Sequence, residues 1–304
     1  MVGRPAGGSR RRRLNWHSGG YMPFIWPALL ITLAVIVFPW VFTGWMSLQN
    51  WQVGAERSFI GLANYARLFS DERFFEATGR TLLYTFLSVL LPLIFGTIAA
   101  LVFHEEFPLR GFLRGIVVMP MMATPVAIAL VWTMMFHPQL GILNYLLSLL
   151  GIPPQLWVFD PGTVIPSLVL VETWQWTPLV MLVVLGGLAS LPSEPYESAL
   201  IDGATWFQRL RFITLPMIVP FLVVAAFLRG VDALKSFDII FAITQGGPGT
   251  ASETINIYLY LQAFSFNDMG YGSAIAVIFM VLVVALTLIL LWLRGCTGWR
   301  EAQG

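Results

Sequence analysis

Six long apolar segments constrain this chain more than any other feature of its sequence. They cover about 23–45, 81–103, 112–136, 164–191, 217–243 and 272–293. A transmembrane helix needs roughly 20 mostly apolar residues, and each segment reaches that length. Because the backbone finds no water to bond in the bilayer core, such segments cross it as helices. The sequence therefore predicts an all-α integral membrane protein with six transmembrane helices.

The composition supports a membrane protein and argues against several other classes of protein. Hydrophobic residues make up 57% of the chain and charged residues only 11%, with a net charge of +1. This composition indicates that the chain lies in a lipid bilayer, and it gives no sign of a nucleic-acid partner. The single cysteine, Cys296, excludes an internal disulfide, and no Cys/His cluster has metal-ligand spacing. No catalytic constellation or phosphate-binding motif is visible, so we expect no catalytic residue, metal or cofactor in this chain.

The chain begins with a polar and basic segment, residues 1–21, that contains the run Arg10–Arg13. A basic start before an apolar stretch is also typical of a signal peptide. The stretch that follows, about 23–45, is too long for a signal core and lacks a clear small-residue cleavage site. We therefore interpret it as the first transmembrane helix, which forms with the charged loop after it a unit of residues 22–77.

The distribution of basic residues predicts the orientation. Six spans place the tails 1–21 and 295–304 on the same side of the membrane. Arginines also occur in the two connectors of that side, at Arg110, Arg114, Arg209 and Arg211. On the opposite side only the first loop, residues 48–80, carries basic residues. The positive-inside rule therefore predicts that both termini are cytoplasmic.

The connector between the fourth and fifth spans is an unusual charged stretch that we expect to form a short amphipathic helix over 194–211. Its apolar residues recur at a roughly helical period, at Ala199, Leu200, Ala204, Phe207 and Leu210. Pro195 suits a helix start, with Ser193 as the N-cap. Gly203 falls in the middle of this predicted helix, where glycine costs about 1 kcal/mol relative to alanine, so we expect a partner to approach closely there. A helix of this kind predicts a docking surface at the cytoplasmic face.

The same connector carries a motif. Glu197, Ser198 and Ala199 are followed by Gly203 and then by Ile213, Leu215 and Pro216. This pattern resembles the EAA loop of ABC importer permeases, with Ser198 where the family usually has alanine. The longer form, with Asp202, Ala204 and Pro220, resembles the carbohydrate-uptake subgroup typified by maltose, glycerol-3-phosphate and trehalose permeases. The first loop also resembles the family, although Arg80 stands where asparagine is usual.

The resemblance implies a type I importer permease fold, with a core domain over 78–294 and a coupling loop over 193–216. It implies a second, homologous permease subunit, two ATP-binding ABC subunits and an extracytoplasmic substrate-binding protein, in a bacterial or archaeal plasma membrane. ATP hydrolysis is then expected in the separate ATPase subunits. The residues that match the ATPase-coupling motif are Glu197, Ser198, Ala199, Asp202, Gly203, Ala204, Ile213, Leu215 and Pro216.

Charged residues inside the apolar segments need an explanation, because each is costly at membrane depth. The fifth segment carries Arg229, Asp232, Lys235 and Asp238, which alternate in sign at intervals of three. As neighbours along one helix, they can neutralise one another as a chain of i,i+3 pairs. Arg229 lies near the middle of the segment, so either a structural role or a place in the transport pathway is open to it.

The fourth segment contains Glu172, Trp174, Gln175 and Trp176. Aromatic rings flanked by hydrogen-bonding groups suit a sugar, although tryptophans also form interfacial belts. The resemblance places the substrate pathway on the fourth and fifth helices. Carried over by spacing from the coupling loop, the pathway residues are Glu172, Trp176, Arg229 and Ala233.

The sequence thus predicts the permease subunit of an ATP-driven importer for a sugar, oligosaccharide or polyol. An ion- or proton-coupled secondary transporter that uses the charged fifth segment is the alternative, and it should show an internal inverted repeat, which is not apparent. A structural or assembly factor would need the amphipathic connector but no polar residues within the spans. Co-purification with an ATPase distinguishes the first hypothesis from both others.

Overall fold

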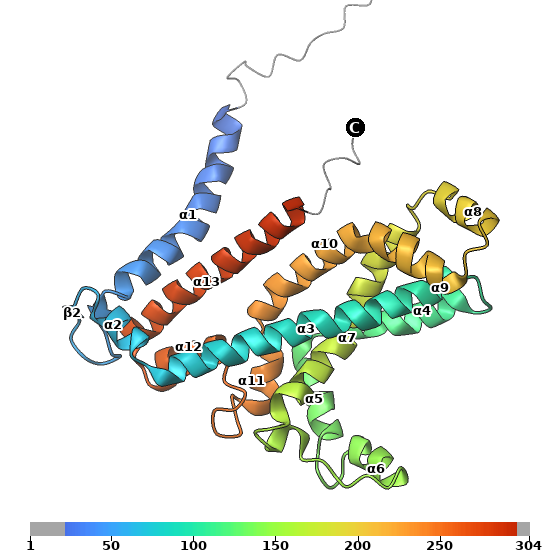
Figure 1. The fold of residues 1–304 in the computed structure, drawn as a ribbon. Helices are drawn as coiled ribbons and strands as arrows, with labels where there is room; N and C mark the ends of the chain where they lie inside the picture. The colour runs from blue at the N-terminus through green and yellow to red at the C-terminus, as the bar shows by residue number, and fades with distance from the viewer. Residues whose placement is uncertain (1–21, 297–304) are drawn as a thin grey trace, which may run out of the picture.

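A computed structural model describes residues 22–296, so the predicted basic tail and most of the C-terminal tail lie outside the described part. Over that range the chain is almost entirely helical (Figure 1). Its elements are α1 (Met22–Met46), β1 (Gln49–Asn50), β2 (Ser58–Phe59), α2 (Ala63–Phe69), α3 (Glu72–His104), α4 (Arg110–Val118), η1 (Met119–Met122), α5 (Pro125–Met135), α6 (Ile142–Leu149), η2 (Trp157–Phe159), α7 (Val164–Leu188), α8 (Glu194–Ile201), α9 (Trp206–Arg209), η3 (Leu210–Thr214), α10 (Leu215–Leu234), α11 (Asp238–Thr244), α12 (Ile255–Tyr260), η4 (Leu261–Ser265) and α13 (Met269–Cys296). The two short strands pair antiparallel, with Gln49 opposite Phe59.

Five helical segments are long and apolar enough to cross a membrane: α1, α3, α7, α13 and the continuous helix formed by α9, η3 and α10. A sixth span results if the bent pair made of Arg110–Met122 and Pro125–Met135 acts as one. The prediction of an all-α membrane protein with six spans is therefore confirmed, with a correction to the shape of the third.

The predicted third span is broken in its middle. Its two halves meet at an angle of 100°. Ala123 and Thr124 are extended at the break, with ψ angles of 147° and 143°. Pro125 explains this geometry, because proline disfavours the helical conformation at the residue before it and starts the next helix without needing an N–H partner.

The predicted fifth span, about 217–243, is also wrong in its bounds. The helix ends at Leu234, and α11 begins only at Asp238. Ser236 holds the break between them, because its hydroxyl donates to Glu172 across 3.2 Å and its carbonyl accepts from Asn256 at 3.5 Å. Tertiary hydrogen bonds therefore end the helix where the apolar pattern continues.

The core of the bundle lies where α3 runs beside α7, with α10 packed on both (Figure 1). Gly96 of α3 allows the close approach, because a Cβ atom there would lie 2.6 Å from Cβ of Val180 in α7. The helix α1 lies beside α13 at one end of the bundle and diverges from it at the other (Figure 1). Its central apolar residues are exposed, from Ile25 to Phe42.

Candidate functional site

An ion pair lies inside the helical bundle, between the fourth and fifth predicted spans. Nη2 of Arg229 in α10 donates to Oε2 of Glu172 in α7 across 2.8 Å. The two side chains are 1% and 4% exposed. A charge of either sign is costly in such surroundings unless an opposite charge and hydrogen bonds accompany it. The ion pair therefore lets α7 and α10 each bury a charge that would be costly without its partner.

Aromatic and hydroxyl groups surround this pair. The guanidinium carbon of Arg229 lies 4.5 Å from the ring centre of Trp176, within the range of a cation–π interaction. Oε1 of Glu172 accepts from the hydroxyl of Ser236, and that hydroxyl also lies 3.2 Å from the hydroxyl of Tyr84 in α3. Three helices and the break after α10 thus meet at one polar cluster.

A cavity of about 280 Å³ opens beside the ion pair. Its lining includes Glu172, Gln175, Trp176 and Arg229 together with the charged residues that follow along α10 and into α11. Oε1 of Gln175 and Nε of Arg229 are buried and have no hydrogen-bond partner among the described residues. Buried polar atoms of this kind are normally satisfied, so the cluster beside the cavity contains one donor and one acceptor that no described residue satisfies.

The charge chain predicted along the fifth span forms only in part. Arg229 and Asp232 approach to 3.9 Å, and Asp232 and Lys235 to 4.0 Å. No ion pair between Lys235 and Asp238 occurs within the described range, because the helix breaks between them. The prediction that these four charges neutralise one another is therefore wrong. The near partner of Arg229 is Glu172, which lies on another helix.

Three of the four predicted pathway residues meet at this cavity. Glu172, Trp176 and Arg229 line it, whereas Ala233 is 2% exposed and is not among the lining residues. The sequence did not single out Ser236 or Tyr84. The signals available for them are weak, since a serine near a helix end and a tyrosine in an apolar run each have many ordinary roles.

The predicted docking helix is in fact two short helices with a turn between them. The first, α8, runs from Glu194 to Ile201, and α9 starts at Trp206. Ser193 holds the N-cap position of α8 as predicted, but its side chain makes no capping hydrogen bond. At the other end the N–H of Gly203 bonds to the carbonyl of Leu200, and the N–H of Ala204 to that of Ala199. This pair of bonds defines a Schellman turn.

Gly203 is thus a helix-stop residue, which corrects its predicted place in mid-helix. Its φ angle is +74°, and a Cβ atom built on it would meet nothing within 4 Å. Glycine is favoured here because the left-handed conformation is strained for residues that carry a Cβ. Backbone conformation, rather than crowding within this chain, explains the glycine.

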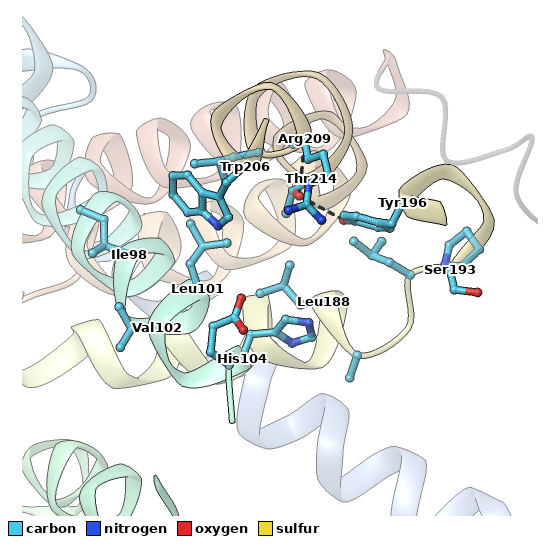
Figure 2. Close-up of a pocket in the computed structure, with 15 residues that line it drawn as sticks. Ile98, Leu101, Val102, His104, Leu188, Ser193, Tyr196, Trp206, Arg209 and Thr214 are labelled. Atoms are coloured by element: carbon cyan, nitrogen blue, oxygen red, sulfur yellow. Dashed lines mark hydrogen bonds between the residues drawn. The ribbon is translucent and has the colours of Figure 1, made fainter. Parts of the chain in front are cut away.

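The second half of the loop is fixed by local hydrogen bonds. Thr205 and Gln208 form a reciprocal capping box at the start of α9. The π-helical turn η3 then contains Ile213, and α10 starts with Leu215 and Pro216. The hydroxyl of Tyr196 in α8 donates to Oγ1 of Thr214 across 3.1 Å, which ties the two halves together (Figure 2).

The loop also presents apolar side chains that nothing in the described chain covers. Ile201 is 87% exposed and Leu200 is 56% exposed. The predicted coupling residues Glu197, Ser198 and Asp202 are exposed on the same short helix and its cap, while Ala199 and Ala204 are partly buried. Clustered apolar exposure rimmed by charge is typical of a protein interaction site.

A second polar cluster, at the opposite end of the bundle, was not predicted. Asp71, the N-cap of α3, accepts hydrogen bonds from the hydroxyls of Tyr258 and Tyr271, the latter at 2.5 Å. Arg73 makes two hydrogen bonds to Glu253, at 2.9 and 2.7 Å, and Arg67 pairs with Asp268 at 2.8 Å. This Asp71 cluster fastens the charged first loop to the segment that leads into α13.

The hydrogen bonds of the Asp71 cluster change the pKa values of its members. Burial alone would raise the pKa of Asp71, but the hydrogen bonds from Tyr258, Tyr271 and the backbone N–H of Arg73 outweigh it and lower that pKa. Burial and the bond to Asp71 raise the pKa of Tyr258 to about 12. At neutral pH the carboxylate is therefore charged and the phenol is its donor.

The helical spans and the polar cavity between them define a multi-pass membrane protein. The chain matches the family model described as "binding-protein-dependent transport system inner membrane component" over residues 92–294. It is 39% identical to a trehalose/maltose transport system permease protein of Thermococcus litoralis, over 79% of this chain and 82% of that protein. The chain therefore belongs to the family of inner membrane components of binding-protein-dependent transport systems, which are ABC transporter permeases.

Other relatives carry related descriptions. A trehalose transport system permease protein of Mycobacterium tuberculosis is 34% identical over 75% of this chain and 74% of that protein. A sulfoquinovosyl glycerol transport system permease protein of Agrobacterium fabrum is 35% identical over 77% of each. Among solved structures, a bacterial ABC transporter involved in the import of the acidic polysaccharide alginate matches the fold with a TM-score of 0.78, at 24% identity, over 90% of this chain and 94% of that one.

Proposed function

We propose that this chain is the permease subunit of an ATP-driven importer for an uncharged sugar, oligosaccharide or polyol. The observation that carries the substrate class is the cavity beside Glu172 and Arg229. It combines the ring of Trp176 with unsatisfied hydrogen-bonding atoms of Gln175 and Arg229. A sugar offers apolar C–H faces and hydroxyl edges that match such a lining. The descriptions of the trehalose/maltose and trehalose relatives support the same class.

Charge supports an uncharged substrate over an acidic one. Arg229 is already paired with Glu172 at 2.8 Å, and Lys235 lies near Asp232. Asp238 adds another acid to the lining. A carboxylate or phosphate on the substrate would therefore meet more negative than positive side chains, and it would have to displace Glu172 to reach Arg229.

We further propose that the loop over 193–216 docks an ATPase subunit. The exposed Leu200 and Ile201 would fill an apolar groove, while Glu197 and Asp202 would face basic residues of the partner. The family description names a binding-protein-dependent system, which supports an extracytoplasmic binding protein. Two ATPase subunits and a second, homologous permease complete the proposed complex.

The proposed orientation follows from the arginine distribution. The loop over 193–216 carries Arg209 and Arg211, and the connector before α4 leads into Arg110 and Arg114. The positive-inside rule then puts this end of the bundle, and both chain termini, in the cytoplasm of a bacterial or archaeal cell. The Asp71 cluster would face the outside, where the binding protein docks.

The proposal is tested with the complex purified from cells that express this chain with an affinity tag. We expect an ABC ATPase, a second permease and a binding protein to accompany it. In proteoliposomes, ATP hydrolysis should rise when the binding protein is loaded with trehalose or maltose, and not when it is offered an acidic sugar. Uptake driven by an ion gradient without ATP, or a chain that purifies without an ATPase, would favour the secondary transporter instead.

A further inference from the structure

A second cavity, of about 770 Å³, lies between the loop over 193–216 and the ends of two spans (Figure 2). It is separate from the cavity beside Arg229, since the two share no lining residue. Its volume is within the range of pockets that bury most of a ligand. None of the residues matched to the coupling motif lines it.

The apolar lining of this cavity comes from residues within the spans. Ile98, Leu101 and Val102 come from the last turns of α3, and Leu188 comes from the end of α7. Val102 is 55% exposed and Ile98 is 52% exposed. These residues therefore continue the apolar surface of the spans up to the level at which the spans end.

The polar lining residues lie where α3 ends and in α9, and they carry both signs of charge. His104 ends α3, and Arg209 and Trp206 belong to α9 (Figure 2). Glu105, the C-cap of α3, also lines the cavity. Arg209 forms no ion pair within residues 22–296, and its Nε atom is buried without a hydrogen-bond partner there. Glu105 likewise has no cation within ion-pair distance in that range. The lining thus contains one cation, Arg209, and one anion, Glu105, that do not form an ion pair with each other.

We propose that this cavity binds a membrane phospholipid whose headgroup contains both a phosphate and a primary ammonium group. The phosphate would bind Arg209, the ammonium would bind Glu105, and an acyl chain would lie along Leu101 and Leu188. An apolar lining that ends in charged residues at the membrane boundary matches the polarity gradient of such a lipid. A purely anionic lipid would leave Glu105 next to the phosphate, where it repels.

Because the cavity joins the end of α3 to α9, a bound lipid would brace the docking loop against the bundle. Its loss would leave Arg209 unsatisfied, and α8 would keep the bond between Tyr196 and Thr214 as its side-chain hydrogen bond to the span. The lipid would therefore act on the transport cycle through the loop, without touching the substrate cavity.

The test measures lipid binding by native mass spectrometry of the full chain, purified in detergent with the subunits that accompany it. Phosphatidylethanolamine, phosphatidylcholine and phosphatidylglycerol are compared at equal concentrations. We expect one phosphatidylethanolamine per chain, and about tenfold weaker binding in Arg209→Gln and in Glu105→Gln, because each loses a charge-assisted hydrogen bond. Arg211→Gln and Glu106→Gln are matched controls outside the lining and should bind as the wild type does.

A second pair of variants separates lipid loss from misfolding. Ala189 is exposed and lines the cavity, whereas its exposed neighbour Ser190 does not. Ala189→Trp should fill the cavity and abolish lipid binding, while Ser190→Trp should leave it intact.

Three results would overturn the proposal. Equal binding of all three lipids would indicate ordinary contact with the bilayer. Stronger binding of phosphatidylglycerol, improved further by Glu105→Gln, would indicate a site for anions alone. Displacement of the lipid when the ATPase binds would show that the cavity receives a segment of that subunit.

Discussion

Arg229 and Glu172 are separated by 57 positions in the chain, yet their side chains meet at 2.8 Å inside the bundle. Each is nearly inaccessible to solvent. The contact ties α10 to α7 and leaves Arg229 paired within the lining of the neighbouring cavity. The ring of Trp176 lies 4.5 Å from the guanidinium carbon, so the pair and the ring form one part of the cavity lining.

The first prediction concerns the energy of this pair. Glu172→Gln should destabilise the purified chain by about 3 to 5 kcal/mol, because it leaves a buried guanidinium without its counter-charge. The double variant Glu172→Gln with Arg229→Gln should recover most of that loss, since two neutral amides can bond to each other. Thermal unfolding of Glu172→Gln, Arg229→Gln and the double variant measures the coupling. Strictly additive effects would show that the two side chains do not depend on each other.

The second prediction concerns the pH dependence of the Asp71 cluster. The pKa of Asp71 in the folded state lies below its ordinary value of 3.8. Its carboxylate therefore stabilises the folded state fully above that value and loses the contribution as pH falls through the folded-state pKa. Asp71→Asn should lower the melting temperature at neutral pH, and the gap to the wild type should narrow in acid. Glu56→Gln, an exposed control in the same loop, should show no gap, and a gap for Asp71→Asn that is the same at all pH values would contradict the prediction.

The third prediction uses the left-handed turn at Gly203. Gly203→Ala should strain the end of α8 by about 1 to 2 kcal/mol, and Gly203→Val by more, because a β-branched residue tolerates this conformation poorly. Gly203→Asn should be the mildest change. ATP hydrolysis stimulated by the binding protein should fall in the order Asn, Ala, Val at equal membrane levels.

Gly186 provides the control for this series. A Cβ atom on Gly186 meets nothing within 4 Å, and its backbone lies within the regular helix α7. Gly186→Ala should therefore leave hydrolysis unchanged. A Gly203→Val variant with full activity would show that the turn is not needed for docking.

The fourth prediction concerns Glu197 on the exposed face of α8. Glu197→Arg should prevent co-purification of the ATPase, because a basic groove would repel the new charge. Glu197→Gln should have a smaller effect, which separates lost attraction from repulsion. Glu106→Arg makes the same charge reversal at another exposed site and should leave recovery normal. Full recovery of the ATPase with Glu197→Arg would exclude this residue from the interface.

Much of the fold could be predicted because membrane spans are marked by length and polarity alone. The same is true of the docking loop, whose charges stand out between apolar segments. Gly203 is a local signal that the sequence analysis missed. A glycine just after a helical segment commonly ends the helix, but the apolar period on both sides of Gly203 favoured one continuous helix. Two local signals therefore disagreed at this position. The helix ends there because glycine adopts the left-handed conformation without strain.

The remaining features depend on contacts that sequence spacing does not contain. Asp71 binds Tyr258 and Tyr271 across 187 and 200 positions. The break after Leu234 depends on what Ser236 meets on other helices. Likewise, a spacing of three made Asp232 the expected partner of Arg229, whereas packing of α7 on α10 supplied Glu172. Charges within a span could be recognised as meaningful, but their partners could not be assigned.

The last prediction separates a substrate role of the tryptophans in α7 from a packing role. Trp176 lines the cavity and covers Arg229, whereas Trp174 is 45% exposed and packs edge-on against Trp132 at 5.7 Å. Trp176→Ala should reduce transport strongly while the complex still assembles, because the sugar loses the aromatic face on which it packs. Trp174→Ala removes an equal volume outside the cavity and should change only stability, by about 1 kcal/mol. Trp176→Phe retains an aromatic face and should restore part of the transport. Uptake of labelled trehalose or maltose by proteoliposomes measures all three, and equal losses in Trp174→Ala and Trp176→Ala would mean that both rings serve packing alone.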